Sequence, residues 1–329
     1  MEAPRHSTNS YQYALSLEHG GVVRVALDGV AYTGGMSVVF AACLLAAEPS
    51  LERILERLSE EAEVFAQLAP RVVARERLLH RGRRSPPRFR PRIGAKSIEA
   101  ALGYVEREVI SEYGWAALKD NPGDLREFRQ VVTVDGRQVK QPEKARLALA
   151  MNMTSEDDRE RKRMLQDFEK YGMIGAAIDF SQDILLFRRQ ALPGYEFSLA
   201  PPRTLGANPV LVVQFLQKSK DEGARVYHGR ELTRVRLQGE IWVREKDLLP
   251  MRIILQIPTK EDGEQVLHSG EIDYVASKHG LLLPTAVRYR KTEGENLLVE
   301  NFAFYNQYRM FKVETEVKFT PEEVTPEPQ

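Results

Sequence analysis

The chain has 329 residues, with 47 Lys and Arg against 47 Asp and Glu, so its formal net charge is zero. This balance disfavours a nucleic-acid-binding protein, which normally has a basic excess, and an acidic disordered chain. A hydrophobic fraction of 43% is enough for a substantial core. The single cysteine, Cys43, excludes an internal disulfide, a cysteine-based zinc site and a CxxC redox centre.

The N-terminal part carries an apolar segment. No residue from Val30 to Ala47 is charged, and small residues precede the polar Glu48-Pro49-Ser50. This pattern is typical of a secretion signal, and the run approaches the ~20 residues that a membrane-spanning helix needs. Cleavage, retention as an anchor and lipidation at Cys43 stay open, although we favour Cys43 as an ordinary signal-peptide residue. We expect residues 1–49 to be a disordered extension plus this signal or anchor, which predicts a location in the periplasm or at the outer membrane.

The first expected element of the folded domain is an amphipathic helix over residues 51–68. Ser50 is a suitable N-cap, and Pro70 follows the end. Apolar residues recur at intervals of three and four, as one buried helix face requires. These residues are Leu51, Ile54, Leu55, Leu58, Ala62, Phe65 and Leu68.

Strands and then helices are expected next. The pattern predicts strands over 72–81, 104–119 and 126–139, with a tight turn at Asp135-Gly136. Helices are predicted from Pro142 to about residue 152, from Thr154 or Ser155 to Gly172, and over 181–189.

From Pro193 onward the pattern is almost entirely strand. Short turns between successive strands indicate an antiparallel meander. The predicted strands lie near 194–200, 209–217, 236–245, 249–257, 266–276, 281–291, 297–309 and 311–319. Residues 320–329 are rich in Pro and Glu and are expected to be a disordered tail.

Together these elements predict an α+β fold for residues 50–319. We expect one large, curved antiparallel sheet of about eleven strands, an open half-barrel whose apolar face must be covered. The helix over 51–68 and the helices over 142–171 are the expected covers, packed into the concave face.

No motif of catalysis or cofactor binding is present. His80, His228, His268 and His279 form no HxH or HExxH pattern, and GxSxG, GxxxxGK[ST] and GxGxxG are absent. We therefore expect no metal, no cofactor and no enzyme activity. An enzyme with dispersed catalytic residues is kept as a third hypothesis, after the two functions given below.

Arginines gather in the loop after the first strand. They include Arg83, Arg84, Arg88, Arg90 and Arg92, and the run is interrupted by Pro86, Pro87 and Pro91. Such a loop could contact a partner protein or an anionic surface. The alternative is a solvated hairpin tip.

The concave apolar face is the other candidate site. Half-open sheets can hold apolar ligands between the sheet and its cover, and the alternative is that these residues are simply core. The candidate ligand-binding residues are Trp242, Met251, Ile253, Leu255, Ile272, Tyr274, Tyr289, Phe302 and Phe304.

The segment Leu237–Ile257 resembles a hairpin of the outer-membrane lipoprotein-sorting superfamily, the LolA-like and RseB-like proteins. The hairpin lacks the usual turn glycine. Two further segments, Tyr104–Val134 and Leu281–Arg290, are also similar to envelope proteins of this type. The residues at the characteristic positions are Gly239, Ile241, Trp242, Val243, Leu249, Pro250 and Arg252.

The resemblance implies a non-catalytic periplasmic half-barrel that carries or senses lipoprotein acyl chains. Its partners would be a lipid or acyl chain, and an envelope protein or membrane surface, with no nucleic acid. The alternative is a protein-interaction or regulatory module with a closed cleft, because the middle segment Pro142–Ala200 exceeds what a minimal carrier needs and could fill the cavity.

Overall fold

The computed structural model describes most of the predicted domain. The described residues are 49–84, 103–118, 121–154, 163–164, 166–168, 170–173, 180–219, 224–228, 231–261, 263–277 and 280–310. The apolar N-terminal segment, the predicted strand 311–319, the tail, and Arg88, Arg90 and Arg92 lie outside them. Within the described part, no helix is long and apolar enough to cross a membrane.

Helix α1, Leu51–Leu68, forms as predicted. The Ser50 side chain accepts a hydrogen bond of 3.3 Å from the backbone N–H of Arg53, which satisfies one of the free donors of the first turn. The helix ends at a short 3-10 turn, η1, Ala69–Arg71, which contains Pro70. The apolar stripe of α1 is buried, and Ile54, Leu58 and Phe65 are 0% exposed.

Eleven of the described strands form one open antiparallel sheet, as predicted. Their order is β4-β3-β2-β1-β13-β12-β11-β10-β9-β6-β5, so β1 and β13 join the two halves of the chain. The strands are β1 Val72–Arg83, β2 Tyr104–Leu118, β3 Asn121–Val134, β4 Arg137–Gln138, β5 Tyr195–Leu205, β6 Asn208–Gln217, β9 Gln238–Arg244, β10 Pro250–Glu261, β11 Glu264–Ala276, β12 Leu282–Glu293 and β13 Asn296–Met310.

The number of strands agrees with the prediction, but their membership differs. The predicted strand 126–139 divides at the turn Asp135-Gly136, where both residues have positive φ, into β3 and the short β4. A separate hairpin, β7 Ala224–His228 with β8 Glu231–Val235, occupies a region where no strand was expected. The eleven therefore include β4, whereas 311–319 is not among the described residues.

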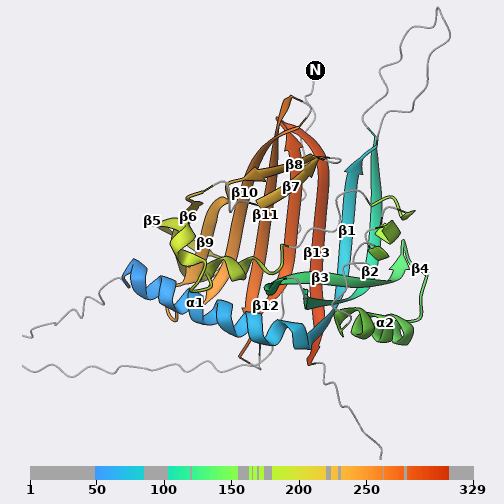
Figure 1. The fold of residues 1–329 in the computed structure, drawn as a ribbon, viewed down its shortest axis with the longest axis horizontal. Coiled ribbons are helices and arrows are strands. Elements are labelled where there is room, and N and C mark those ends of the chain that lie inside the picture. Colours follow the sequence, from blue (N-terminus) through green and yellow to red (C-terminus); the bar gives the residue numbers. More distant parts are fainter. Residues whose placement is uncertain are drawn as a thin grey trace, which may run out of the picture. The chain divides into compact units, whose positions relative to one another are not determined.

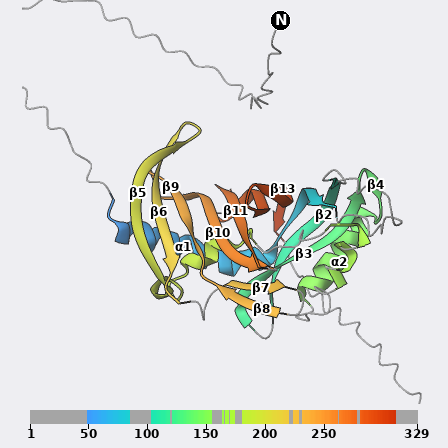
Figure 2. The same cartoon turned by 90° about the horizontal axis from the view of Figure 1, so that it is seen from above.

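The sheet curves around α1, which lies across its inner face (Figures 1 and 2). A row of directly paired, buried residues crosses seven strands on this face, and it is part of the main core with α1. The row is Ile241, Ile253, Ile272, Val287, Ala303, Leu78 and Val109.

Helix α2, Pro142–Thr154, packs on the opposite, outer face, which corrects the expectation that it covers the concave side. Its residues Leu149 and Met153 form a small core with Ala116 and Phe128. Phe128 pairs with Gly114, and a Cβ at Gly114 would lie 2.8 Å from the sulfur of Met153. The missing side chain of Gly114 therefore lets α2 approach the sheet on that face.

The middle segment supplies the rest of the inner cover. The predicted helix 181–189 is replaced by a short 3-10 helix, η2 Asp183–Phe187, and a second one, η3 Leu192–Gly194, follows it. Met164 and Phe168 of the preceding segment, and Ile184 and Phe187 of η2, are buried in the main core.

Candidate functional site

The inner face holds five of the nine predicted ligand-binding residues. Ile253, Leu255, Ile272, Tyr274 and Tyr289 are buried in the core that α1 and η2 cover. Each is at most 6% exposed, so these side chains contact the protein's own cover. The structure brings them together, and their role in ligand binding stays a prediction.

The remaining four predicted residues do not lie in this core. Trp242, Phe302 and Phe304 are half-buried on the outer face, because they alternate with the inward residues Ile241 and Ala303. Met251 is half-buried at a β-bulge of β10, where the register shifts between Pro250 and Arg252. The placement of Trp242, Phe302 and Phe304 on the concave face is therefore corrected, whereas Met251 lies outside the inner core.

Phe180 fills a hollow in the inner face. The hollow exists because Gly270 has no side chain, and a Cβ there would lie 3.2 Å from the Phe180 ring. The ring also packs against Tyr289, with 5.4 Å between centroids. Because Leu255 pairs directly with Gly270, Phe180 sits over the centre of the candidate ligand surface.

A buried polar cluster holds the segment that carries Phe180. The backbone N–H and the hydroxyl of Ser181 donate to Oε1 of Glu127 at 2.9 and 2.5 Å. The indole N–H of Trp115 donates to the Ser181 hydroxyl at 3.0 Å, and the Tyr274 hydroxyl donates to the Ser181 carbonyl at 3.2 Å. Ser181 is thus fixed to β2, β3 and β11 together.

Arg129 completes this cluster by joining two carboxylates. Its Nε donates to the carboxylate of Glu76 at 2.8 and 3.0 Å, and its Nη2 donates to Glu127. All three residues are buried. Burial disfavours the charged guanidinium, but Glu76 and Glu127 outweigh it and keep the pKa of Arg129 well above its ordinary value.

Buried tyrosines surround the ion cluster. Burial raises the pKa of Tyr113 well above its ordinary value, with the charge of Glu127 acting in the same direction. Burial also raises the pKa of Tyr305, as do Glu76 and Glu127. These phenols are therefore neutral at physiological pH, and the Tyr113 hydroxyl lies 2.5 Å from the Ser181 hydroxyl.

Sequence reasoning missed this cluster, although a signal was present. Glu76, Glu127 and Arg129 stand at inward-facing positions of their strands, where alternation predicts apolar residues. Charged residues at such positions must pair with each other.

The arginine loop is described only at its base. The backbone N–H of Arg84 donates to the carbonyl of Gly103 at 2.7 Å, which continues the β1–β2 hairpin. A guanidinium nitrogen of Arg83 lies 3.9 Å from the carboxylate of Glu293. The proposed surface contact of this loop stays a prediction.

His268 is the strand histidine with the clearest partners. Its Nδ1 lies 2.9 Å from the Tyr289 hydroxyl, and its Nε2 lies 3.0 Å from Oε1 of Glu261. Among the described residues, no group of three or more His, Cys, Asp or Glu is placed to hold a metal ion.

Comparison with known proteins gives similarity at the level of structure. No family model and no curated protein matches the sequence. A DUF1329 family protein from Desulfovibrio piger is 11% identical with a TM-score of 0.33, and the alignment covers 78% of this chain and 92% of that one. A putative outer membrane lipoprotein-sorting protein domain from Vibrio parahaemolyticus is 11% identical with a TM-score of 0.34, covering 80% and 95%.

A LolA superfamily protein from Nitrosomonas europaea is also similar, with 10% identity, a TM-score of 0.28 and coverage of 79% and 94%. The curved sheet itself is established by the strand order and register of this chain.

Proposed function

We propose that this chain is a non-catalytic binding protein of the bacterial cell envelope that takes up a lipophilic ligand, such as a lipoprotein acyl chain, as a carrier or sensor. The observation that carries the proposal is the position of Phe180, an apolar side chain inserted over Gly270 and Tyr289. An acyl chain of similar cross-section would occupy the same hollow once the Phe180 ring rotates out of it.

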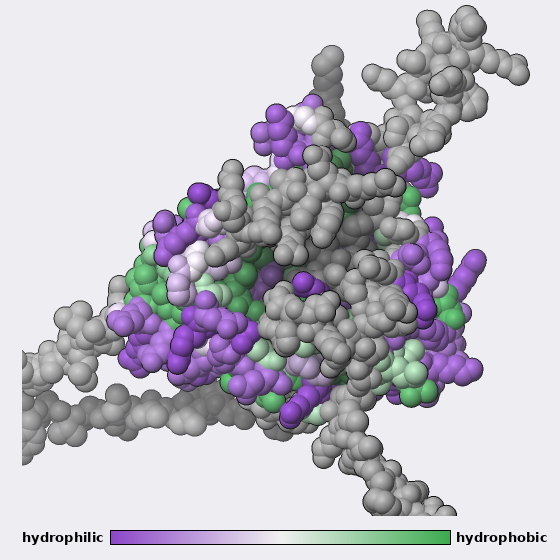
Figure 3. Space-filling view, in the orientation of Figure 1, coloured by the Kyte–Doolittle hydropathy of each residue, from purple (hydrophilic) through white to green (hydrophobic). Residues whose placement is uncertain are grey.

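A groove beside α1 would give a ligand a route to the inner face of the sheet. Leu51 and Leu55 of α1 and Leu192 of η3 line a cavity of about 820 Å³. The three leucines also pack against the main core, so the groove borders the inner face. Figure 3 shows the hydrophilic surface of α1 and hydrophobic residues gathered beside it, over the end of the sheet that carries β5 and β6.

The buried polar groups favour binding over catalysis. Ser181 hydrogen-bonds to both Glu127 and Tyr113, but each of the three residues is 0% exposed. A general acid or base must come within hydrogen-bond reach of a substrate. In this cluster those bonds are made to the protein itself, and they fix the segment that carries Phe180.

The test is binding of a fluorescent fatty acid, cis-parinaric acid, to the delipidated full chain. We expect saturable binding, and tighter binding by Phe180→Ala, because the hollow over Gly270 is then free. Phe128→Ala is the matched control, since Phe128 is equally aromatic and buried but belongs to the outer core under α2. Both variants lose packing worth about 3–5 kcal/mol, so folding is verified by circular dichroism.

The proposal is wrong if neither the wild type nor Phe180→Ala binds the probe. It is also wrong if Phe128→Ala increases binding as much as Phe180→Ala does, because the effect would then reflect general loosening. N-terminal sequencing of the exported protein tests the envelope location separately.

A second candidate is a protein-interaction or regulatory module whose cleft remains closed. It is favoured by two exposed apolar residues of α2, Leu147 at 65% and Met151 at 64%, which lie one turn apart. Cross-linking in envelope extract would compare the wild type with Leu147→Glu/Met151→Glu and with a chain lacking the 82–103 loop. Loss of one defined cross-linked partner, without any fatty-acid binding, would favour this candidate.

A further inference from the structure

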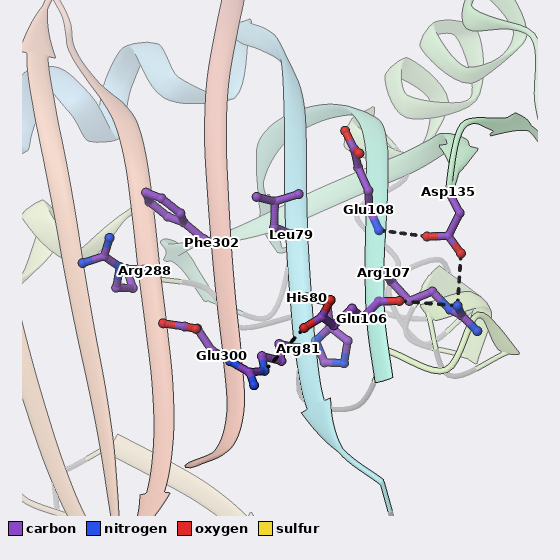
Figure 4. A pocket seen from close by; sticks show the side chains of 10 residues that line it. All are labelled: Leu79, His80, Arg81, Glu106, Arg107, Glu108, Asp135, Arg288, Glu300 and Phe302. Atoms are coloured by element: carbon purple, nitrogen blue, oxygen red, sulfur yellow. Dashed lines mark hydrogen bonds and ion pairs between the residues drawn. The ribbon is translucent and has the colours of Figure 1, made fainter. Parts of the chain in front are cut away.

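We propose that the outer face of the sheet carries a second site, a pocket for a small organic anion with an apolar body. Strands β12, β13, β1 and β2 form its floor, on the face opposite to α1 (Figure 4). The cavity has a volume of about 460 Å³, within the range of small-molecule sites. The site is separate from the inner face of the proposed function.

The floor of this pocket is apolar. Phe302 and Leu79 are direct cross-strand partners, and both are half-buried on the outer face. Phe302 also packs against Phe304, with 4.1 Å between ring centroids. An apolar ligand body would cover these side chains and remove them from water.

The acidic groups around the floor already have partners. Glu108 pairs with Arg77 at 2.6 Å and Glu300 pairs with Arg290 at 2.7 Å. The two others are Asp135, which pairs with Arg107 at 3.1 Å, and Glu106, which pairs with Arg81 at 3.6 Å. These four pairs make the rim close to neutral.

Arg288 is the exception. Its guanidinium carbon lies 4.6 Å from the centre of the Phe302 ring, and within the described part of the chain it forms no ion pair. Its cross-strand neighbour Glu271 pairs with Arg252 instead, at 3.1 Å. A guanidinium stacked on an aromatic ring keeps its in-plane N–H groups available for a carboxylate.

The charge and the size together select the ligand class. One cation beside an apolar floor matches one carboxylate attached to a hydrocarbon group. A neutral rim gives no broad attraction to an anionic membrane, which depends on clusters of basic residues. The chemistry is therefore that of an aryl or short-chain alkyl carboxylate.

The experiment is a calorimetric titration of the full chain with 1-naphthaleneacetate and with its neutral analogue, 1-naphthaleneacetamide. We expect the carboxylate to bind at least tenfold more tightly than the amide. Arg288→Gln should weaken carboxylate binding at least tenfold and leave amide binding unchanged. Arg203→Gln is the matched control, because the Arg203 guanidinium also lies over an aromatic ring of the outer face, that of Trp242, but Arg203 belongs to β5 and does not line this pocket.

The proposal is overturned if the carboxylate does not bind, if the acid and the amide bind with equal affinity, or if Arg288→Gln retains full affinity. An equal loss in Arg203→Gln would also overturn it, since it would indicate nonspecific attraction to surface charge. Nuclear magnetic resonance shifts must fall on amides of β12, β13 and β1, whereas shifts confined to residues around Phe180 would assign the ligand to the inner face.

Discussion

Trp242 of β9 and Arg252 of β10 are direct cross-strand partners on the outer face of the sheet. The guanidinium of Arg252 lies 5.7 Å from the indole centre, and Arg203 of β5 lies 5.2 Å from it. Arg252 also makes two hydrogen bonds to Asp273, at 2.6 and 2.9 Å. Trp242 and Arg252 of the 237–257 hairpin therefore connect side chains of β5, β9, β10 and β11 on the outer face. They do not line the concave face.

This arrangement predicts energetic coupling between the two residues. In a double-mutant cycle of Trp242→Leu and Arg252→Met, we expect a coupling of about 1 kcal/mol, because the pair is only partly exposed. Urea unfolding measures it. A cycle of Trp242→Leu with Arg290→Met, three strands away, should be additive. Equal coupling in both cycles would contradict a specific contact between Trp242 and Arg252.

Gly239 shows why the same hairpin could be recognised from sequence. A Cβ at Gly239 would lie 2.0 Å from the backbone oxygen of Ile254 and 2.8 Å from the Phe215 ring. Backbone cannot yield as a side chain can, so only glycine fits. The glycine of the motif is therefore required by a local backbone contact. A short stretch of sequence is enough to specify such a contact.

Gly239→Ala is expected to destabilise the protein more than Gly270→Ala. The first change meets backbone, whereas the second meets the Phe180 ring at 3.2 Å, and that ring can turn aside. Overpacking a well-packed site typically costs about 1–3 kcal/mol and at times more. The free energies of unfolding of the two variants, measured in urea, give the order, and a larger loss for Gly270→Ala would refute this reading.

The faces of the strands were harder to predict than the strands themselves. On β13 the aromatic residues Phe302 and Phe304 point outward, while the smaller Ala303 points toward the α1 side. Sequence reasoning assigned the larger side chains to the core. Because α1 covers one face and α2 part of the other, apolar residues occur on both, and hydrophobicity alone does not tell the faces apart.

The polar cluster could not be predicted because its members are far apart in sequence. Glu76, Arg129 and Ser181 meet only through the pairing of β1, β2 and β3 and the path of the middle segment. Strand prediction gives each local pattern but not the register between strands. The strand pattern was sufficient to predict that these charged residues point inward, but not that they contact one another.

Arg129→Met is expected to be strongly destabilising. It leaves the carboxylates of Glu76 and Glu127 buried without their cation, and breaking such a pair costs about 3–5 kcal/mol. Arg77→Met is the matched control, because its ion pair with Glu108 is exposed and is worth about 0–1 kcal/mol. Guanidinium chloride unfolding measures both.

A neutralised version of the cluster separates charge from packing. The triple variant Arg129→Met/Glu76→Gln/Glu127→Gln removes the uncompensated charges and should recover part of the stability lost in Arg129→Met. If the triple variant is no more stable than the single one, lost packing and hydrogen bonds dominate, and the electrostatic explanation fails.

His80 makes the stability depend on pH. Burial lowers the pKa of His80 below its usual value of 6.5, and the charge of Arg107 acts in the same direction, while the hydrogen bond to Asn301 opposes both. The folded state therefore binds the proton less readily than the unfolded state. The resulting stability is fully present above pH 6.5 and is lost as the pH falls below it.

The free energy of unfolding should thus decrease between pH 7 and pH 5 more steeply in the wild type than in His80→Gln. Asn301→Asp places a carboxylate 2.7 Å from the ring nitrogen Nδ1, where the amide oxygen now lies, and should raise the pKa of His80 and flatten the slope. Urea unfolding at half-unit pH intervals gives the slopes, and resonance titration of the His80 ring gives its pKa directly. Identical slopes in the wild type and His80→Gln would show that other groups control the acid sensitivity, because the linkage of His80 must disappear when its titrating ring is removed.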